Sequence, residues 1–106
     1  MAKFLVNGNY TADGVKGLLK EGGTNRHKAV ESMVNKLGGK FEAFYYAFGD
    51  YDVIAIVEVP DAVTAAGMSM AINSTGLVEV TLTPLLSPSD IDAAAKKSVG
   101  YRAPGT

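Results

Sequence analysis

The chain has 106 residues, 47% of them hydrophobic and 20% charged, with a formal net charge of −1 and no cysteine. This length and composition predict one globular domain over residues 1–106, with a tail at 99–106. The missing cysteines exclude disulfides and zinc-thiolate sites, and the balanced charge argues against a nucleic-acid-binding face.

The N-terminal part predicts a strand and two helices. Lys3 to Tyr10 is the strand, because apolar side chains recur at alternate positions. Thr11 is expected to cap a short helix over 12–20, which two glycines weaken by about 1 kcal/mol each. Thr24 is expected to cap a stronger helix over 25–37, whose buried stripe comprises Val30, Met33, Val34 and Leu37.

The centre of the chain predicts a β-hairpin with strands at 41–48 and 53–59, rich in aromatic and β-branched residues. Gly49-Asp50 between them predicts a type II′ turn, because glycine takes a positive φ without a Cβ clash. In this register Phe48 pairs with Tyr51, and the side chains alternate between two faces. One face carries Glu42, Phe44, Tyr46, Phe48, Tyr51, Val53, Ala55 and Val57, and the other carries Phe41, Ala43, Tyr45, Ala47, Asp52, Ile54, Ile56 and Glu58.

The C-terminal part predicts a helix, a strand and a further helix. Asp61 is expected to cap a helix over 62–75, and no charged residue occurs between Ala62 and Val78. A strand follows at 77–85. Ser87-Pro88-Ser89-Asp90 is a helix start with a capping box, and this last helix is expected to reach about Ser98.

This order of elements predicts an α+β fold of ferredoxin-like type. It is a βαββαβ antiparallel sheet with helices on one face and an extra C-terminal helix. The other face of the sheet would be apolar and bare, so we expect two sheets to pack face to face in a homodimer. The uncharged helix has a second apolar side, which the C-terminal tail or a higher oligomer would cover.

Two carboxylates of the hairpin are candidate acid or base residues. Asp52 and Glu58 sit among apolar neighbours, where burial would raise their pKa. The alternative is that both side chains lie at strand ends, reach water, and cap or pair with local groups.

Five further residues are candidates for a ligand-binding site between the sheet and its helices. Arg26 lies near a helix N-terminus, which favours anions, and the single histidine, His27, follows it. The alternatives are a surface salt bridge for Arg26 and a plain surface position for His27. Tyrosine hydroxyls would supply polar groups in an apolar pocket or pack at a dimer seam. We expect Arg26 and His27 at the pocket rim with one of Tyr10, Tyr45 or Tyr46.

No metal site or cofactor is expected. One histidine without cysteine or a second ligand is no metal signature, and the glycines form no phosphate-binding pattern. The N-terminal segment lacks the apolar stretch of a signal peptide, so we expect a cytoplasmic protein without a membrane contact.

Several short motifs together resemble the GYD domain family. They are Tyr10-Thr11 with Gly14, Arg26, Gly38-Gly39, Gly49-Asp50-Tyr51-Asp52, Glu58 and Pro60-Asp61. The resemblance runs from Lys3 to about Ser98 and implies a dimeric α+β barrel whose activity is largely uncharacterised. Gly-Asp-Tyr-Asp is also similar to the hairpin loop of the amino-acid-sensing domain of Lrp/AsnC-type regulators, whose helix-turn-helix is missing here.

The sequence therefore leaves three functions open. The first is a small-molecule-binding dimeric barrel. The second is a cofactor-independent enzyme, an isomerase or monooxygenase, which fold analogy alone suggests. The third is an interaction module without a ligand. The first two need an apolar cavity with converging polar groups, whereas the third predicts a filled core.

Overall fold

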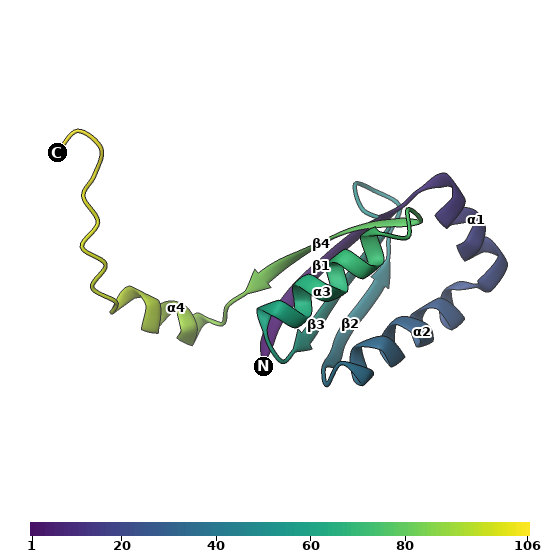
Figure 1. Cartoon of the computed structure of the whole chain (residues 1–106), viewed down its shortest axis with the longest axis horizontal. Coiled ribbons are helices and arrows are strands. Elements are labelled where there is room, and N and C mark those ends of the chain that lie inside the picture. Colours follow the sequence, from purple (N-terminus) through teal and green to yellow (C-terminus); the bar gives the residue numbers. More distant parts are fainter.

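The computed structural model describes residues 1–106 as one sheet with helices on one side and a C-terminal arm that leaves it (Figure 1). The elements are β1 (Ala2–Tyr10), α1 (Ala12–Glu21), α2 (Gly23–Lys36), β2 (Lys40–Tyr46), β3 (Val53–Val59), α3 (Ala62–Asn73), β4 (Val78–Leu85) and α4 (Pro88–Ala95). The expected βαββαβ order is therefore corrected to βααββαβα. Gly22, with φ at 90°, ends α1 and precedes α2, so the first crossover holds two separate helices.

The four strands form one antiparallel sheet in the order β2-β3-β1-β4. β1 lies in the interior and pairs with β3 on one side and β4 on the other. β4 is an edge strand, and the side chain of Asn73 on α3 exchanges two hydrogen bonds with the backbone of Val80, at 2.7 and 3.1 Å. This contact covers part of the free edge and ties α3 to the sheet.

The hairpin between β2 and β3 differs from the predicted turn. Tyr46 pairs with Val53 as expected, but a wider loop replaces the two-residue turn and Gly49 has no positive φ. The Asp52 N–H donates to the carbonyl oxygen of Gly8 at 2.9 Å. This bond draws the loop toward the end of β1, so the strands separate after the Ala47–Asp52 hydrogen bond and the predicted type II′ turn is wrong.

A bulge in β2 also changes which side chains face the helices. The register shifts between Phe41 and Ala43, and Phe41 lies opposite Val57. Phe41 therefore packs on the helix side, whereas the predicted alternation placed it on the other face. Glu42 moves to the opposite side, where Lys3 donates to it at 3.1 Å. The pairing from Ala43 to Tyr46 keeps the predicted register.

The hydrophobic core lies between one face of the sheet and the helices α2 and α3. The predicted alternation of β1 and β3 is confirmed, since their even and odd positions respectively are buried. The buried side of α3 includes Ala65 and Met68. The core comprises Phe4, Val6, Val34, Ala55, Val57, Val59, Ala65, Met68 and Val80.

Three of the four helices begin with a side-chain cap. Thr11, Asp61 and Ser87 accept hydrogen bonds at the starts of α1, α3 and α4. α2 begins instead after Gly22, so the expected cap at Thr24 is wrong. α4 ends at Ala95, before the expected Ser98. No helix in the chain has the length and hydropathy that a membrane span requires.

Residues 86–106, here called the arm, consist of α4 and the segments beside it. Every arm residue is exposed, and the arm extends away from the sheet in Figure 1. The chain measures 57 × 33 × 22 Å, with a radius of gyration of 16.9 Å. A compact chain of this size would have a radius of gyration of about 13 Å. The arm therefore buries none of its residues against the rest of the chain.

Candidate functional site

A small apolar cavity lies between the sheet and helices α2 and α3. Its volume is about 80 Å³, and 14 of its 15 lining residues are hydrophobic. The charged exception is Arg26, and Tyr10 brings a phenol to the lining. The remaining walls are core side chains such as Met33, Phe44 and Ile72. The cavity is thus an apolar space whose lining includes one cation and one hydroxyl.

Tyr10 and Tyr46 lie next to each other at the end of the sheet. Burial, followed by the neighbouring Tyr46, raises the pKa of Tyr10 to about 12. Burial also raises the pKa of Tyr46. Both phenols are therefore protonated at neutral pH and act as hydrogen-bond donors. The Tyr46 hydroxyl donates to the carbonyl oxygen of Gly23 at 2.9 Å and so ties β2 to the start of α2.

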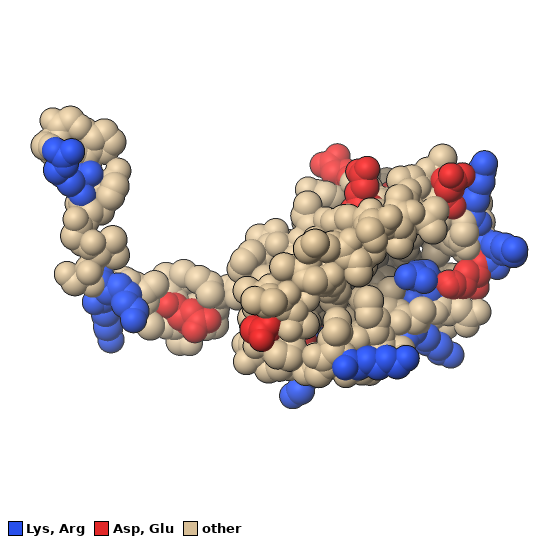
Figure 2. Space-filling view, in the orientation of Figure 1, with Lys and Arg blue, Asp and Glu red and all other residues tan.

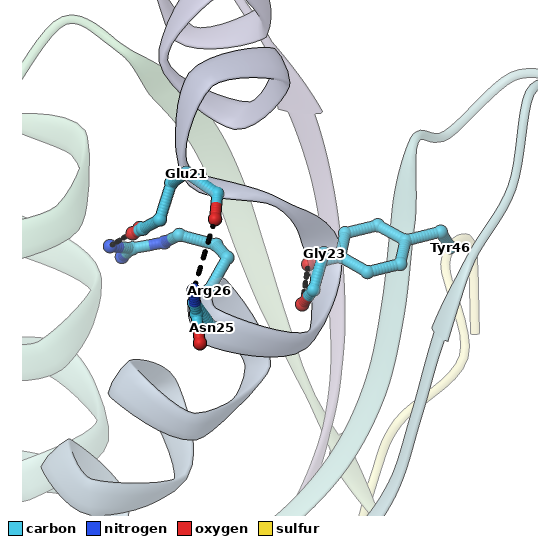
Figure 3. A network of polar contacts seen from close by, with 5 residues as sticks. All are labelled: Glu21, Gly23, Asn25, Arg26 and Tyr46. Carbon is cyan, nitrogen blue, oxygen red and sulfur yellow. Dashed lines mark hydrogen bonds and ion pairs between the residues drawn. The ribbon is translucent and has the colours of Figure 1, made fainter.

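Arg26 belongs to a polar network at the junction of α1 and α2 (Figure 3). Its guanidinium lies 3.7 Å from the Glu21 carboxylate, and the Asn25 side chain donates to the Glu21 carbonyl oxygen at 3.2 Å. Both charged side chains are partly exposed, so this ion pair contributes little to stability. The pair holds the guanidinium beside the cavity, where it lines the wall.

His27 packs against the aromatic residues of β2. Its ring stacks on Phe44 at 4.7 Å between centroids and meets Phe41 edge-on at 5.5 Å. It is half-buried and lines none of the cavity. Its contacts are thus those of a packing residue beside the cavity wall.

The other candidates lie away from the cavity. Tyr45 is 70% exposed, on the face opposite the helices. Asp52 accepts the Tyr10 N–H at 2.9 Å, so its carboxylate fixes the end of β1. Glu58 lies opposite Lys3 in the register of β1 and opposite Lys40 in that of β2. The structure therefore brings Tyr10, Tyr46 and Arg26 together and leaves Tyr45, Asp52 and Glu58 in other places.

Sequence reasoning missed the partners in this network. Glu21 and Arg26 lie five positions apart across a helix break, a spacing that no helical pairing rule selects. The Gly23 carbonyl that Tyr46 bonds is a backbone group without a sequence signal. Phe44 was placed on the correct face, but its stacking with His27 depends on how α2 lies over β2. No group of three or more His, Asp or Glu side chains is placed to hold a metal ion.

A second candidate site is the sheet face opposite the helices, here called the outer face. Its centre is formed by neighbouring apolar side chains, Leu5, Ala43, Tyr45, Ile54 and Ile56. One end carries charges, Lys3, Lys40, Glu42 and Glu58. No helix covers this surface, and an apolar centre with a charged edge is typical of protein–protein interfaces.

Residues 4–95 match the model of the GYD domain. The chain belongs to the GYD domain family. It is also 30% identical over 97 residues to a protein of Thermus thermophilus named glutamine synthetase and cystathionine beta-lyase binding protein. The alignment covers 91% of this chain and 100% of that relative. Comparison with solved structures gives no match.

Proposed function

We propose that this GYD domain protein is a homodimeric binding module that associates with an enzyme and does not itself catalyse a reaction. The observation that carries the proposal is the outer face, whose apolar centre no helix covers. The cavity of about 80 Å³ is smaller than small-molecule sites, which usually enclose about 300–1,000 Å³, and the cleft of about 720 Å³ that Tyr10 and Arg26 also line is open to solvent. The apolar outer face therefore suits a macromolecular partner.

The first partner in this proposal is a second copy of the chain. A standard interface removes about 800 Å² from each partner. Pairing of two outer faces would cover Leu5, Ile54 and Ile56, which otherwise form an apolar patch on a sheet. The charged edge would set the register of the two sheets.

The second partner in this proposal is an enzyme of the kind that the relative binds. That relative is named for binding glutamine synthetase and cystathionine beta-lyase, and its whole length aligns with this chain. The aligned region therefore contains whatever part of the relative makes those contacts. We extend the same two enzymes to this chain as its candidate partners.

Association with immobilised glutamine synthetase and cystathionine beta-lyase tests this proposal. The full chain should bind at least one of them at micromolar concentration. Lys16→Ala, at an exposed position of α1 outside the outer face, is the folded control and should bind equally. Ile56→Asp should lose binding, because it charges the apolar centre of the outer face and leaves the core intact. Binding to neither enzyme, or equal binding by the Ile56→Asp variant, would contradict the proposal.

Small-molecule binding is a second candidate function, which the cavity favours. Arg26 and the Tyr10 hydroxyl would recognise a carboxylate whose short apolar tail enters the cavity. Butyrate would then raise the melting temperature of the natural chain, because it binds only the folded state. Arg26→Gln should abolish this shift, while Lys28→Gln, an exposed cation on the same helix, should retain it. No shift with short-chain carboxylates would exclude this candidate.

Catalysis is not part of the proposal. Asp52 is bonded to the backbone of β1, and His27 packs on aromatic rings outside the cavity lining. An acid–base mechanism needs such a group within hydrogen-bond reach of the reacting atoms. This arrangement offers a binding surface in preference to an active site.

A further inference from the structure

The outward side of α3 is an uncharged stripe that no part of the chain covers. Val63, Ala66, Gly67 and Met70 recur at helical spacing along it, and Val63 is 82% and Met70 72% exposed. Figure 2 shows the surface over α3 without Lys, Arg, Asp or Glu, apart from the acidic group near its start. Here these four residues are called the α3 stripe. A soluble chain rarely leaves a helix side of this kind in water.

The arm carries a second unpartnered apolar surface. Ile91, Ala94 and Ala95 share one side of α4, and Ile91 is 53% exposed. Leu86 before the helix and Val99 after it are exposed apolar residues as well. Asp90 and Asp92 flank the apolar side, and the lysines follow the helix. The arm therefore presents an uncharged strip that would fit against the α3 stripe without burying a charge.

The arm does not cover the α3 stripe of its own chain. β4 runs directly into α4 through Leu86 and Ser87, and the capping box of Ser87 with Asp90 fixes the start of the helix beside Pro88. In Figure 1 these elements carry the arm past the end of the sheet, away from α3. The α3 stripe and the arm are thus two apolar surfaces of one chain that do not meet within it.

The total exposed area indicates that the arm lacks a contact within the single chain. The chain exposes 7335 Å², about 1,700 Å² more than a compact monomer of 11.1 kDa. The arm is the part of the chain that extends beyond the compact body. Small residues on both surfaces, Gly67 and Ala66 on α3 and Ala94 on α4, permit close approach of the two helices.

We infer that the arm of one chain packs on the α3 stripe of a second copy, so that copies are linked by exchanged arms. The occupant of the α3 stripe is therefore α4 of another molecule of this chain. The inference requires no other partner and stands independently of enzyme binding.

Cysteine cross-linking tests this exchange, because the natural chain has no cysteine. The full-length variants Met70→Cys and Ile91→Cys are mixed, one of them with a larger tag, and treated with a short bis-maleimide. A mixed cross-linked product should form several-fold faster than with the control pair Lys16→Cys and Ile91→Cys, whose lysine is exposed on α1. Adding Val63→Glu to the Met70→Cys chain should reduce the product to the control level.

Three results would overturn the inference. Equal cross-linking with the α1 control would indicate random collision. Absence of any mixed product would show that the arm of a second copy does not occupy the α3 stripe. A chain that carries both Met70→Cys and Ile91→Cys, treated at high dilution, should give little internal product. A mainly internal product would show that the arm closes on its own α3.

Discussion

The two faces of the sheet are made by alternate residues of the same strands, but only one of them is covered within the chain. Val57 packs under α2 and α3 and is 1% exposed, whereas the adjacent Ile56 lies on the outer face among Leu5 and Ala43. The two faces are similarly apolar at their centres. Alternating apolar residues therefore specify where the strands form. They do not specify what covers each face, which must be a separate element of the chain or a separate molecule.

Substitution of the two adjacent residues should separate these faces most strongly. Val57→Asp places an unpaired carboxylate in the core and should lower the free energy of unfolding by about 4 kcal/mol or more. Ile56→Asp should leave the fold intact and break the contact between two outer faces, so that the mass of the assembly falls. Circular dichroism during denaturation measures the first effect and sedimentation the second. Similar unfolding of both variants would remove the distinction between the faces.

A pair of glycine substitutions extends the comparison to the helices. A Cβ at Gly14 on α1 would overlap the Leu77 carbonyl oxygen, which also accepts the Thr11 N–H at 3.0 Å. Gly14→Ala should therefore destabilise the fold by about 2 kcal/mol. Gly67→Ala faces open space on α3 and should stabilise it by about 1 kcal/mol, because alanine favours the helix. Urea unfolding measures both, and equal effects would contradict the assigned packing.

Adjacent tyrosines on β2 give a smaller version of the same contrast. Tyr46→Phe removes the hydroxyl that bonds the Gly23 carbonyl, so the free energy of unfolding should fall by about 1 kcal/mol. Tyr45→Phe removes an exposed hydroxyl on the outer face and should leave stability unchanged. Thermal unfolding of the two variants is the measurement. A larger loss for Tyr45→Phe would reverse the assignment of the two side chains.

Much of the fold follows from the sequence because its cues are local. The alternation in β1 and β3 and the capping residues are each set by residues within a few positions. The turn predicted at Gly49-Asp50 was wrong because the Asp52 N–H donates to the Gly8 carbonyl oxygen, which is a long-range contact. The bulge at Glu42 likewise depends on pairing with β3. Long-range contacts of this kind leave no local pattern in the sequence.

The candidate site was predictable to the same extent. Arg26 and His27 were predicted at the rim of a pocket between sheet and helices, with one of three tyrosines. Arg26 and Tyr10 line the cavity, whereas His27 does not. Tyr45 was grouped with them because residue type alone does not separate the tyrosines. The pairing of Arg26 with Glu21 forms across the helix break at Gly22, which a helical spacing rule does not cover.

A further expected effect is a pH dependence from Tyr10 on the covered side. Because burial raises the pKa of Tyr10 to about 12 from 10.0, the folded state holds this proton more tightly than the unfolded state. The stabilisation is complete below pH 10 and is lost as the pH rises toward 12. Tyr10→Phe should flatten the fall in stability across this range, while Tyr45→Phe should not. Identical profiles for Tyr10→Phe and the natural chain would contradict the burial of this phenol.

Light scattering on the full chain at micromolar concentration tests most directly whether the outer face binds a second copy. We expect a mass that is an even multiple of 11.1 kDa, which falls when Ile56→Asp is introduced and is unchanged by Lys16→Ala. A mass of 11.1 kDa for the natural chain, or an Ile56→Asp variant that keeps the larger mass, would contradict it.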